Sequence, residues 1–165
     1  MGRSADYSRQ SCAVAASLHI VGEPWTLLIL RDAFRGLSRF EQWQDSLGMA
    51  RNVLAARLKS LVAHGVLETR LYCERPKRQE YMLSAKGREL RPLIIHLMDW
   101  GARHVYGADK PQTELIHEAC GKALTPVICC AACDARLARD GLTMRYNAAA
   151  RPLSDLFRAE DHPGR

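Results

Sequence analysis

Apolar residues recur at helical spacing through most of the first half of the chain. The stretch 12–21 predicts a short apolar helix that stops near Gly22. The segment from Trp25 to Phe34 is apolar nearly all round, which is typical of a helix in the centre of a core. Gly36 marks the end of that helix.

Two more helices joined by a tight turn are expected next. Ser38 is a candidate N-cap, and Glu41, three residues later, is its expected capping-box partner. The turn falls at Gly48, and a fourth helix is predicted over 50–64. Three leucines form its apolar face: Leu54, Leu58 and Leu61.

The apolar period then changes from 3.6 to 2. Residues 66–72 predict a strand, 73–78 a polar loop and 79–83 a returning strand. Ser84 is the expected cap of a long helix over 84–106. Pro92 lies inside this helix and should kink it or remove one hydrogen bond.

This order of elements predicts a mainly α fold with a small β-hairpin, the winged helix-turn-helix. In that fold the helix at 50–64 lies in the major groove of DNA, and its N-terminal residues meet the base edges. Arg51 can donate two hydrogen bonds to guanine, and Asn52 suits adenine. The outward positions are Arg51, Asn52, Ala55, Ala56 and Lys59.

Positive charge is concentrated on the same part of the chain. The net charge is +6, and residues 51–78 hold seven Lys/Arg against two Asp/Glu. Such a concentration is typical of a polyanion-binding surface, although a solvated basic face without a partner has the same composition. The further candidate DNA contacts are Ser38 and Arg39, and Arg75, Lys77 and Arg78 in the hairpin loop.

The residues also resemble a known family. The resemblance spans about residues 12–106 and rests on the runs CAVAASLHIVGEPWTLLILRDAFRG, SRFEQW, GMARNVLAARLKSLVAHGVLETR, EYMLSAKGREL and DWG. On these runs the chain resembles the HxlR-type winged-helix regulators of bacteria, relatives of the MarR group.

The resemblance implies a homodimer built through the first and last helices of the domain, a palindromic operator and repression. The inducing signal stays open between a small-molecule effector, oxidation at Cys12 and no signal at all. Three positions depart from the family pattern. Ala50 stands where the family usually has Ser or Thr, Ala13 replaces a common Pro, and Gln79 replaces an apolar residue. The identities of the base contacts stay open.

Cys12 is the first of two cysteine features. It lies at the start of the first helix, where a helix N-terminus stabilises a thiolate. It also matches the position that senses oxidants or electrophiles in some members of the family. The alternative is a small buried residue with no chemistry.

The second feature consists of two pairs of potential metal ligands, and in each pair the residues are three positions apart. The pairs are His117-x-x-Cys120 and Cys130-x-x-Cys133. A tetrahedral zinc site needs four such ligands. Nine residues separate the pairs, fewer than in common zinc ribbons, so a disulfide-prone or inert cluster stays an alternative. No cofactor is required by the predicted function, and zinc is the candidate metal.

Other classes of protein find little support. There is no phosphate-binding Gly-rich loop, HExxH motif or apolar run of membrane-spanning length, so we expect a cytoplasmic non-enzyme with no membrane partner. A winged-helix module that binds only protein is the rival interpretation. The predicted organisation is a mobile arm (1–11), the DNA-binding and dimerisation domain (12–107), a Cys-rich extension (108–146) and a flexible tail (147–165).

Overall fold

The structure is a computed structural model, and it divides by its internal contacts into two compact units. Unit 1 is Met1–Arg91 together with Ala149–Arg165, and unit 2 is Pro92–Ala148. The described residues are 7, 9–107, 109, 111, 113–137, 141–145 and 147–157. Most of the predicted mobile arm, residues 1–6 and 8, lies outside them.

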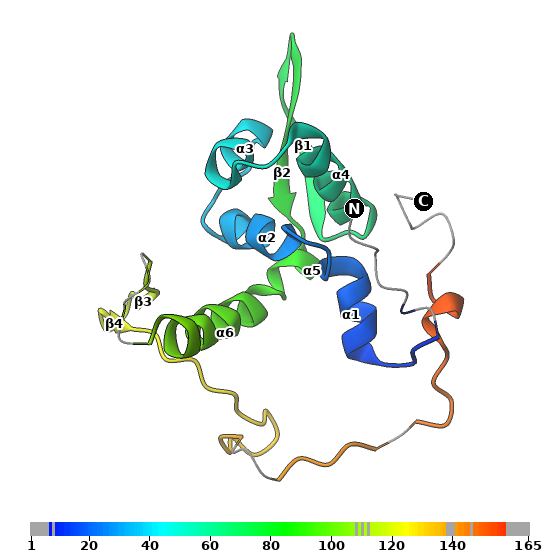
Figure 1. The fold of residues 1–165 in the computed structure, drawn as a ribbon, viewed down its shortest axis with the longest axis vertical. Helices are drawn as coiled ribbons and strands as arrows, with labels where there is room; N and C mark the ends of the chain where they lie inside the picture. Colours follow the sequence, from blue (N-terminus) through cyan, green and yellow to red (C-terminus); the bar gives the residue numbers. More distant parts are fainter. Residues whose placement is uncertain are drawn as a thin grey trace. The chain divides into compact units, whose positions relative to one another are not determined.

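Unit 1 contains the four helices that the sequence predicts (Figure 1). They are α1 (Ala13–Val21), α2 (Thr26–Phe34), α3 (Phe40–Leu47) and α4 (Arg51–Ala63). The central position predicted for α2 is confirmed for Ile29 and Leu30, which are fully buried. The helix is not buried all round, because Leu28 and the N-cap residue Trp25 are about two-fifths exposed.

The start of α3 differs from the prediction. Ser38 is not its N-cap and Glu41 is not its capping partner. The helix begins after Arg39, and the Gln42 side-chain oxygen accepts hydrogen bonds from the backbone N–H groups of Ser38 (3.0 Å) and Arg39 (2.9 Å). The reason lies outside the helix, because residues 38–39 are extended and pair with the hairpin.

The hairpin is the wing of the fold, and it is longer than predicted. Strand β1 (Leu67–Glu74) pairs antiparallel with β2 (Lys77–Leu83), with a register shift between Leu71 and Cys73. The strands continue to pair beyond this shift as far as Glu74 and Lys77. The expected six-residue loop is therefore a turn of two residues. In Figure 1 the hairpin projects beyond α3 and α4.

The predicted long helix is interrupted. Ser84 does cap a helix, accepting a hydrogen bond from the Gly87 N–H (2.9 Å), but this helix is only α5 (Ala85–Arg88). A second helix, α6 (Arg91–Gly101), continues as a π-helical turn over Ala102–Tyr106. Pro92 explains the break, since it has no N–H for an earlier carbonyl and is tolerated only in the first turn of a helix.

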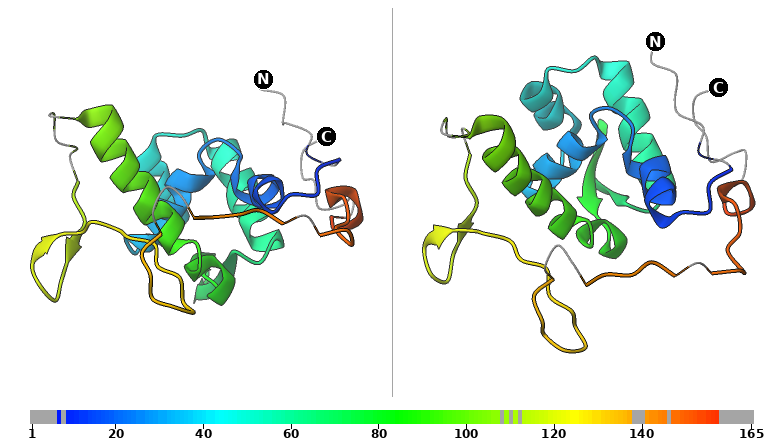
Figure 2. Two further views of the ribbon diagram at one scale, coloured as in Figure 1. Left: turned by 90° about the horizontal axis from the view of Figure 1, so that it is seen from below. Right: turned by 60° about the horizontal axis from the view of Figure 1, so that its bottom comes forward.

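Unit 2 also contains a small hairpin, and the described tail residues from 149 to 157 belong to unit 1. The hairpin is formed by β3 (Ile116–His117) and β4 (Lys122–Ala123). A 3₁₀ turn, Leu153–Asp155, lies beside α1 (Figure 2). Leu153 is buried and its N–H donates to the carbonyl of Gln10 (2.9 Å). These contacts order part of the segment predicted as a flexible tail, and the flexibility of that tail stays a prediction.

In the described part of the chain, no single helix is long and apolar enough to cross a bilayer. Helices α1 and α2 pass such a test only when taken together, and they are bent by 80°.

Candidate nucleic-acid interface

The turn between α3 and α4 is set by two backbone conformations. Gly48 has a positive φ of 62°, in the left-handed region that glycine adopts without strain. Ala50 is extended and precedes α4 without a side-chain cap, as its methyl group dictates. Met49 lies between them and is buried. The turn is therefore tight and anchored in the core.

The two faces of α4 have different surroundings. Leu54, Leu58 and Leu61 are at most 1% exposed, so they form the packed face. The predicted outward residues are all exposed: Arg51, Asn52, Ala55, Ala56 and Lys59. The structure thus presents the predicted reading face to solvent, and its contact with DNA stays a prediction.

Arg51 is held in place by side chains of α3. Its Nη1 donates to the Gln44 side-chain oxygen (2.8 Å), and its guanidinium lies 4.8 Å from the ring centre of Phe40. A guanidinium fixed in this way loses less conformational entropy when it binds. The residue at the N-terminal end of α4 is therefore pre-positioned.

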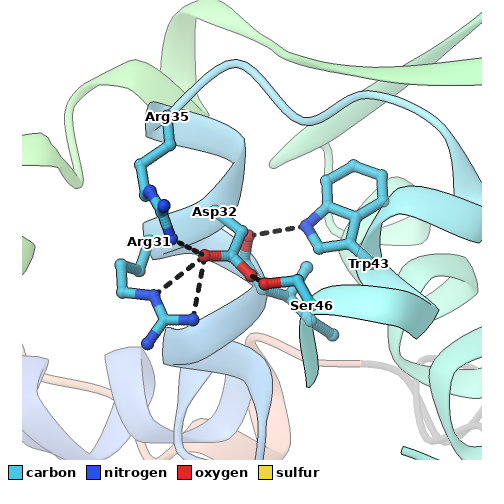
Figure 3. Close-up of polar contacts among 6 residues, drawn as sticks. Arg31, Asp32, Arg35, Trp43 and Ser46 are labelled. Carbon is cyan, nitrogen blue, oxygen red and sulfur yellow. Dashed lines mark hydrogen bonds and ion pairs between the residues drawn. The ribbon is translucent and has the colours of Figure 1, made fainter. Parts of the chain in front are cut away.

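Beneath this surface a buried carboxylate joins α2 to α3 (Figure 3). Asp32 is fully buried, and one carboxylate oxygen accepts from Arg31 Nε (2.9 Å). The other accepts from the hydroxyl of Ser46 on α3 (2.7 Å). Nearby, the indole N–H of Trp43 donates to the backbone carbonyl of Ile29 (3.1 Å). These bonds fix the distance between the two helices.

Opposing effects set the charge state of Asp32. Burial raises the pKa of its carboxyl, while hydrogen bonds from Arg31 and Ser46 and the charges of Arg31 and Arg35 lower it; the net pKa is lowered. The group is therefore a carboxylate at neutral pH and holds its two arginines as ion pairs.

A second buried carboxylate fixes the base of the wing. Glu80 on β2 accepts from Arg70 Nε (2.7 Å) and from the Ser38 hydroxyl (3.4 Å). Arg39 bridges to Glu80 through the backbone, and its guanidinium lies 4.7 Å from the ring centre of Tyr72. Ser38 thus has a role within the fold, and Arg39 remains exposed.

The wing tip carries the three basic residues predicted for DNA. Arg75 lies in the turn, and Lys77 and Arg78 lie at the start of β2. All three are exposed. Two of the three therefore stand on a strand, with a hydrogen-bonded backbone, and not in a loop.

Cys12 is exposed and directly precedes α1. Hydrogen bonds from the backbone N–H groups of Ala15 and Val14 lower the pKa of its thiol. The lowered pKa agrees in direction with the effect expected at a helix N-terminus, and the redox role of Cys12 stays a prediction.

The candidate metal ligands are brought together only in pairs. His117 Nδ1 lies 3.3 Å from the Cys120 sulfur. Hydrogen bonds from the backbone of Ala132 and from the side chain and backbone of Cys133 lower the pKa of the Cys130 thiol. Within the described ranges no three His, Cys, Asp or Glu side chains meet as a metal-binding group.

Sequence comparison decides the family. The model of the HxlR-like helix-turn-helix family matches residues 20–110. The chain belongs to the HxlR-like helix-turn-helix family. It is 38% identical over 131 residues to the HTH-type transcriptional regulator Rv3095 of Mycobacterium tuberculosis, covering 79% of this chain and 83% of the relative.

Solved structures agree with this assignment. The HxlR-like chain resembles PA1607, a proposed transcription factor, with a TM-score of 0.68 and 39% identity over 81% of this chain and 99% of that one. The reduced form of the redox regulator HypR matches with a TM-score of 0.54 and 25% identity, over 59% of this chain and 99% of that one. The chain is a DNA-binding transcriptional regulator with a winged helix, and the protein-interaction module is not favoured.

Two residues that organise this HxlR-like interface were missed by the sequence analysis. Asp32 and Glu80 are the buried acids that join α2, α3 and the wing. A signal for Asp32 was present, because a lone acid in an apolar helix with Arg31 beside it and Arg35 three residues later is typical of a buried ion pair. Glu80 had no such local signal, since its partners Ser38 and Arg70 are 42 and 10 residues away.

Proposed function

We propose that this HxlR-like regulator binds a palindromic operator as a homodimer and represses transcription from it in the cytoplasm. The observation that carries the proposal is the exposed face of α4, which begins at a guanidinium held by Gln44 and Phe40. Two such helices related by a two-fold axis would address two half-sites one helical turn apart.

Base recognition is assigned to the first turn of α4. Arg51 donates two hydrogen bonds to a guanine, and Asn52 pairs with an adenine in the major groove. Ala55 and Ala56 have short side chains, which lets the helix approach the bases closely. Lys59 lies further along the same face and contacts phosphate.

The wing supplies affinity that does not depend on sequence. Arg75, Lys77 and Arg78 are exposed near the tip of a hairpin whose base is fixed by Glu80. They contact phosphates or the adjacent minor groove. Each phosphate contact makes binding weaker as the salt concentration rises.

The dimer is supported by apolar residues that are left exposed on two helices. On α6, Leu93, Leu97 and Trp100 follow at helical spacing and are 42%, 44% and 56% exposed. On α1, Val14 and Leu18 are 66% and 39% exposed. Apolar stripes of this kind are typical of surfaces covered by a partner subunit.

The signal proposed for this regulator is oxidation or alkylation of Cys12. Its exposure and lowered thiol pKa favour the reactive thiolate. A relative of known structure, HypR, is a redox regulator. The small-molecule effector stays a prediction.

The test is a binding titration by fluorescence anisotropy on the upstream intergenic DNA of the gene and on a random duplex of equal length, at several salt concentrations. We expect clear preference for the upstream duplex. Arg51→Ala should lose about 1–3 kcal/mol of that preference. Lys77→Ala should weaken binding to both duplexes and reduce the salt slope by about 1.

The matched control is Lys86→Ala, which removes the same charge from a side chain that reaches the other end of α4, where its Nζ donates to the carbonyl of His64 (2.8 Å). It should bind both duplexes like the parent. If Arg51→Ala discriminates between the duplexes as well as the parent does, the assignment of the reading residue is wrong.

A further inference from the structure

Two turns in unit 2 share one backbone geometry. In the first, the N–H groups of Cys120 and Gly121 donate to the carbonyl of His117 (3.2 and 2.8 Å). This turn thus contains two residues that can bind a metal, three positions apart. They are followed by a residue with positive φ, Gly121, whose φ is 66°.

The second turn repeats this pattern without glycine. The N–H groups of Cys133 and Asp134 donate to the carbonyl of Cys130 (3.3 and 2.8 Å), and Asp134 has a φ of 55°. Asp is one of the few side chains that visit this region, at some cost in strain. The backbone therefore adopts the same turn although the sequence favours it less.

Both turns stand at the tips of antiparallel hairpins. The first is closed by the pairs Ile116 with Ala123 and His117 with Lys122. The second is closed by the bridge between Cys129 and Arg136, and both can be followed in Figure 2. A turn at the tip of a hairpin points two ligands in one direction, which is how structural zinc sites are built.

Distances within the first pair suit one metal ion. His117 Nδ1 and the Cys120 sulfur are 3.3 Å apart. Tetrahedral zinc with its usual bond lengths to nitrogen and sulfur separates two such ligands by about 3.5 Å. In the second pair, the backbone N–H of Cys133 donates to the carbonyl of Cys130 (3.3 Å), so the turn keeps the two cysteines close together. Each pair is thus set to bind a shared ion.

The segment has no core of its own to hold it. Every residue from 113 to 137 is exposed or half-buried, including Val127 and Ile128, which are 52% and 54% exposed. A segment this short seldom folds without a metal, a disulfide or a partner. A metal ion would supply the missing stabilisation by cross-linking the hairpins.

We propose that His117, Cys120, Cys130 and Cys133 bind one structural zinc ion per chain. Binding releases the three thiol protons to solvent and leaves zinc with three thiolates and one neutral imidazole. In the structure the pairs stay apart, so binding draws the two hairpins together. Ten residue steps from Cys120 to Cys130 span up to about 33 Å, which leaves ample reach.

Cys129 provides a built-in control. It is exposed and adjacent to Cys130, but it lies four residues before Cys133 and outside the shared turn. The same holds for Cys73, which is on the wing. Neither belongs to the proposed ligand set.

The test is the zinc content of the full-length protein, purified without an affinity tag under reducing conditions and measured by mass spectrometry. We expect one zinc per chain in the parent, in Cys129→Ser and in Cys73→Ser. Cys130→Ser and His117→Ala should retain less than a tenth of it. Replacement by Co²⁺ should give the visible bands of a tetrahedral thiolate site in the parent and not in Cys130→Ser.

DNA binding is measured in the same preparations. Because the ligands lie outside the winged helix, a variant that loses only its zinc should still bind DNA, whereas a variant that fails to fold should not. A parent without zinc overturns the proposal, as does equal zinc content in all variants or loss of zinc in Cys129→Ser. A disulfide among Cys120, Cys130 and Cys133 under these reducing conditions would also overturn it. The zinc content is measured without DNA, so the result does not depend on whether the proposed operator exists.

Discussion

Asp32 has its carboxylate fully buried between α2 and α3, with Arg31, Arg35 and Ser46 around it. Removing one partner of a buried ion pair leaves the others desolvated without compensation. Because both arginines are partly exposed, the loss is smaller than for a fully enclosed pair.

Asp32→Asn should lower the free energy of unfolding by about 2 kcal/mol at neutral pH, measured by urea denaturation. The lowered pKa of Asp32 in the folded state sets the pH dependence. Its contribution is present above the unfolded pKa of about 3.9 and is lost as the pH falls through the folded value. The difference between parent and variant should therefore be constant from about pH 6 to 8 and shrink below about pH 4.

Asp45→Asn is the matched control, since Asp45 is exposed on α3. Its effect should stay within about 0.5 kcal/mol. A similar loss of stability in both variants would show that the cluster around Asp32 has no special role.

Cys12 allows a second prediction at this scale. Backbone hydrogen bonds lower the pKa of its thiol, so its thiolate forms at a lower pH than that of an ordinary cysteine. Alkylation of Cys12 by iodoacetamide, followed by peptide mass spectrometry, should reach its plateau rate at a lower pH in the folded protein than in the protein unfolded in urea. Equal pH profiles would contradict the proposed reactive thiol.

At the scale of elements, α5 is short but closely packed against the start of the wing. Ser84 hydrogen-bonds to the Gly65 carbonyl (2.6 Å) and caps the helix, and Gly87 faces the carbonyl oxygen of Val66. A Cβ atom at position 87 would overlap that oxygen, so the backbones come too close for any other residue.

Gly87→Ala should therefore destabilise the fold by about 3 kcal/mol, although alanine is the better helix former. Thermal unfolding followed by circular dichroism measures this. The neighbouring Lys86→Ala should change stability by no more than about 0.5 kcal/mol. Gly87→Ala with the stability of the parent would mean that α5 does not approach β1 so closely.

The elements also show what could be predicted from sequence. The helices up to α4 follow from apolar periodicity and glycine stops, which are local signals. The isolated β-bridge of Arg39 could not be predicted, because its partner Glu80 is distant in sequence. The break before α6 was visible only as Pro92, and the apolar stripe that continues across it suggested one helix.

The candidate site divides in the same way. The outward face of α4 follows from its period, and its exposure agrees with the prediction. The carboxylates beneath it depend on partners in other elements. Lys77 and Arg78 lie on a strand because they pair with β1 beyond a bulge near Leu71, and no residue pattern indicated that bulge.

At the scale of the whole molecule, the assembly is the main prediction. The chain has a mass of 18.5 kDa, and the proposed dimer should have twice that mass by light scattering. Leu97→Asp places a charge in the exposed apolar stripe of α6 and should give a single chain with at least tenfold weaker operator binding, because a desolvated charge costs several kcal/mol.

Met144→Asp is the control, since Met144 is 90% exposed and belongs to no such stripe. It should remain dimeric. A parent that is a single chain at micromolar concentration, or a Leu97→Asp variant that stays dimeric, would rule out this interface.

The division of α4 into a packed face and a reading face has an evolutionary consequence. Leu54, Leu58 and Leu61 carry the stability of the helix, whereas Ala55, Ala56 and Lys59 face only solvent. Mutations on the outer face can therefore accumulate without a loss of folding. A gene duplicate of this regulator could acquire a new operator by drift at a handful of codons, while selection continues to preserve the leucines behind them.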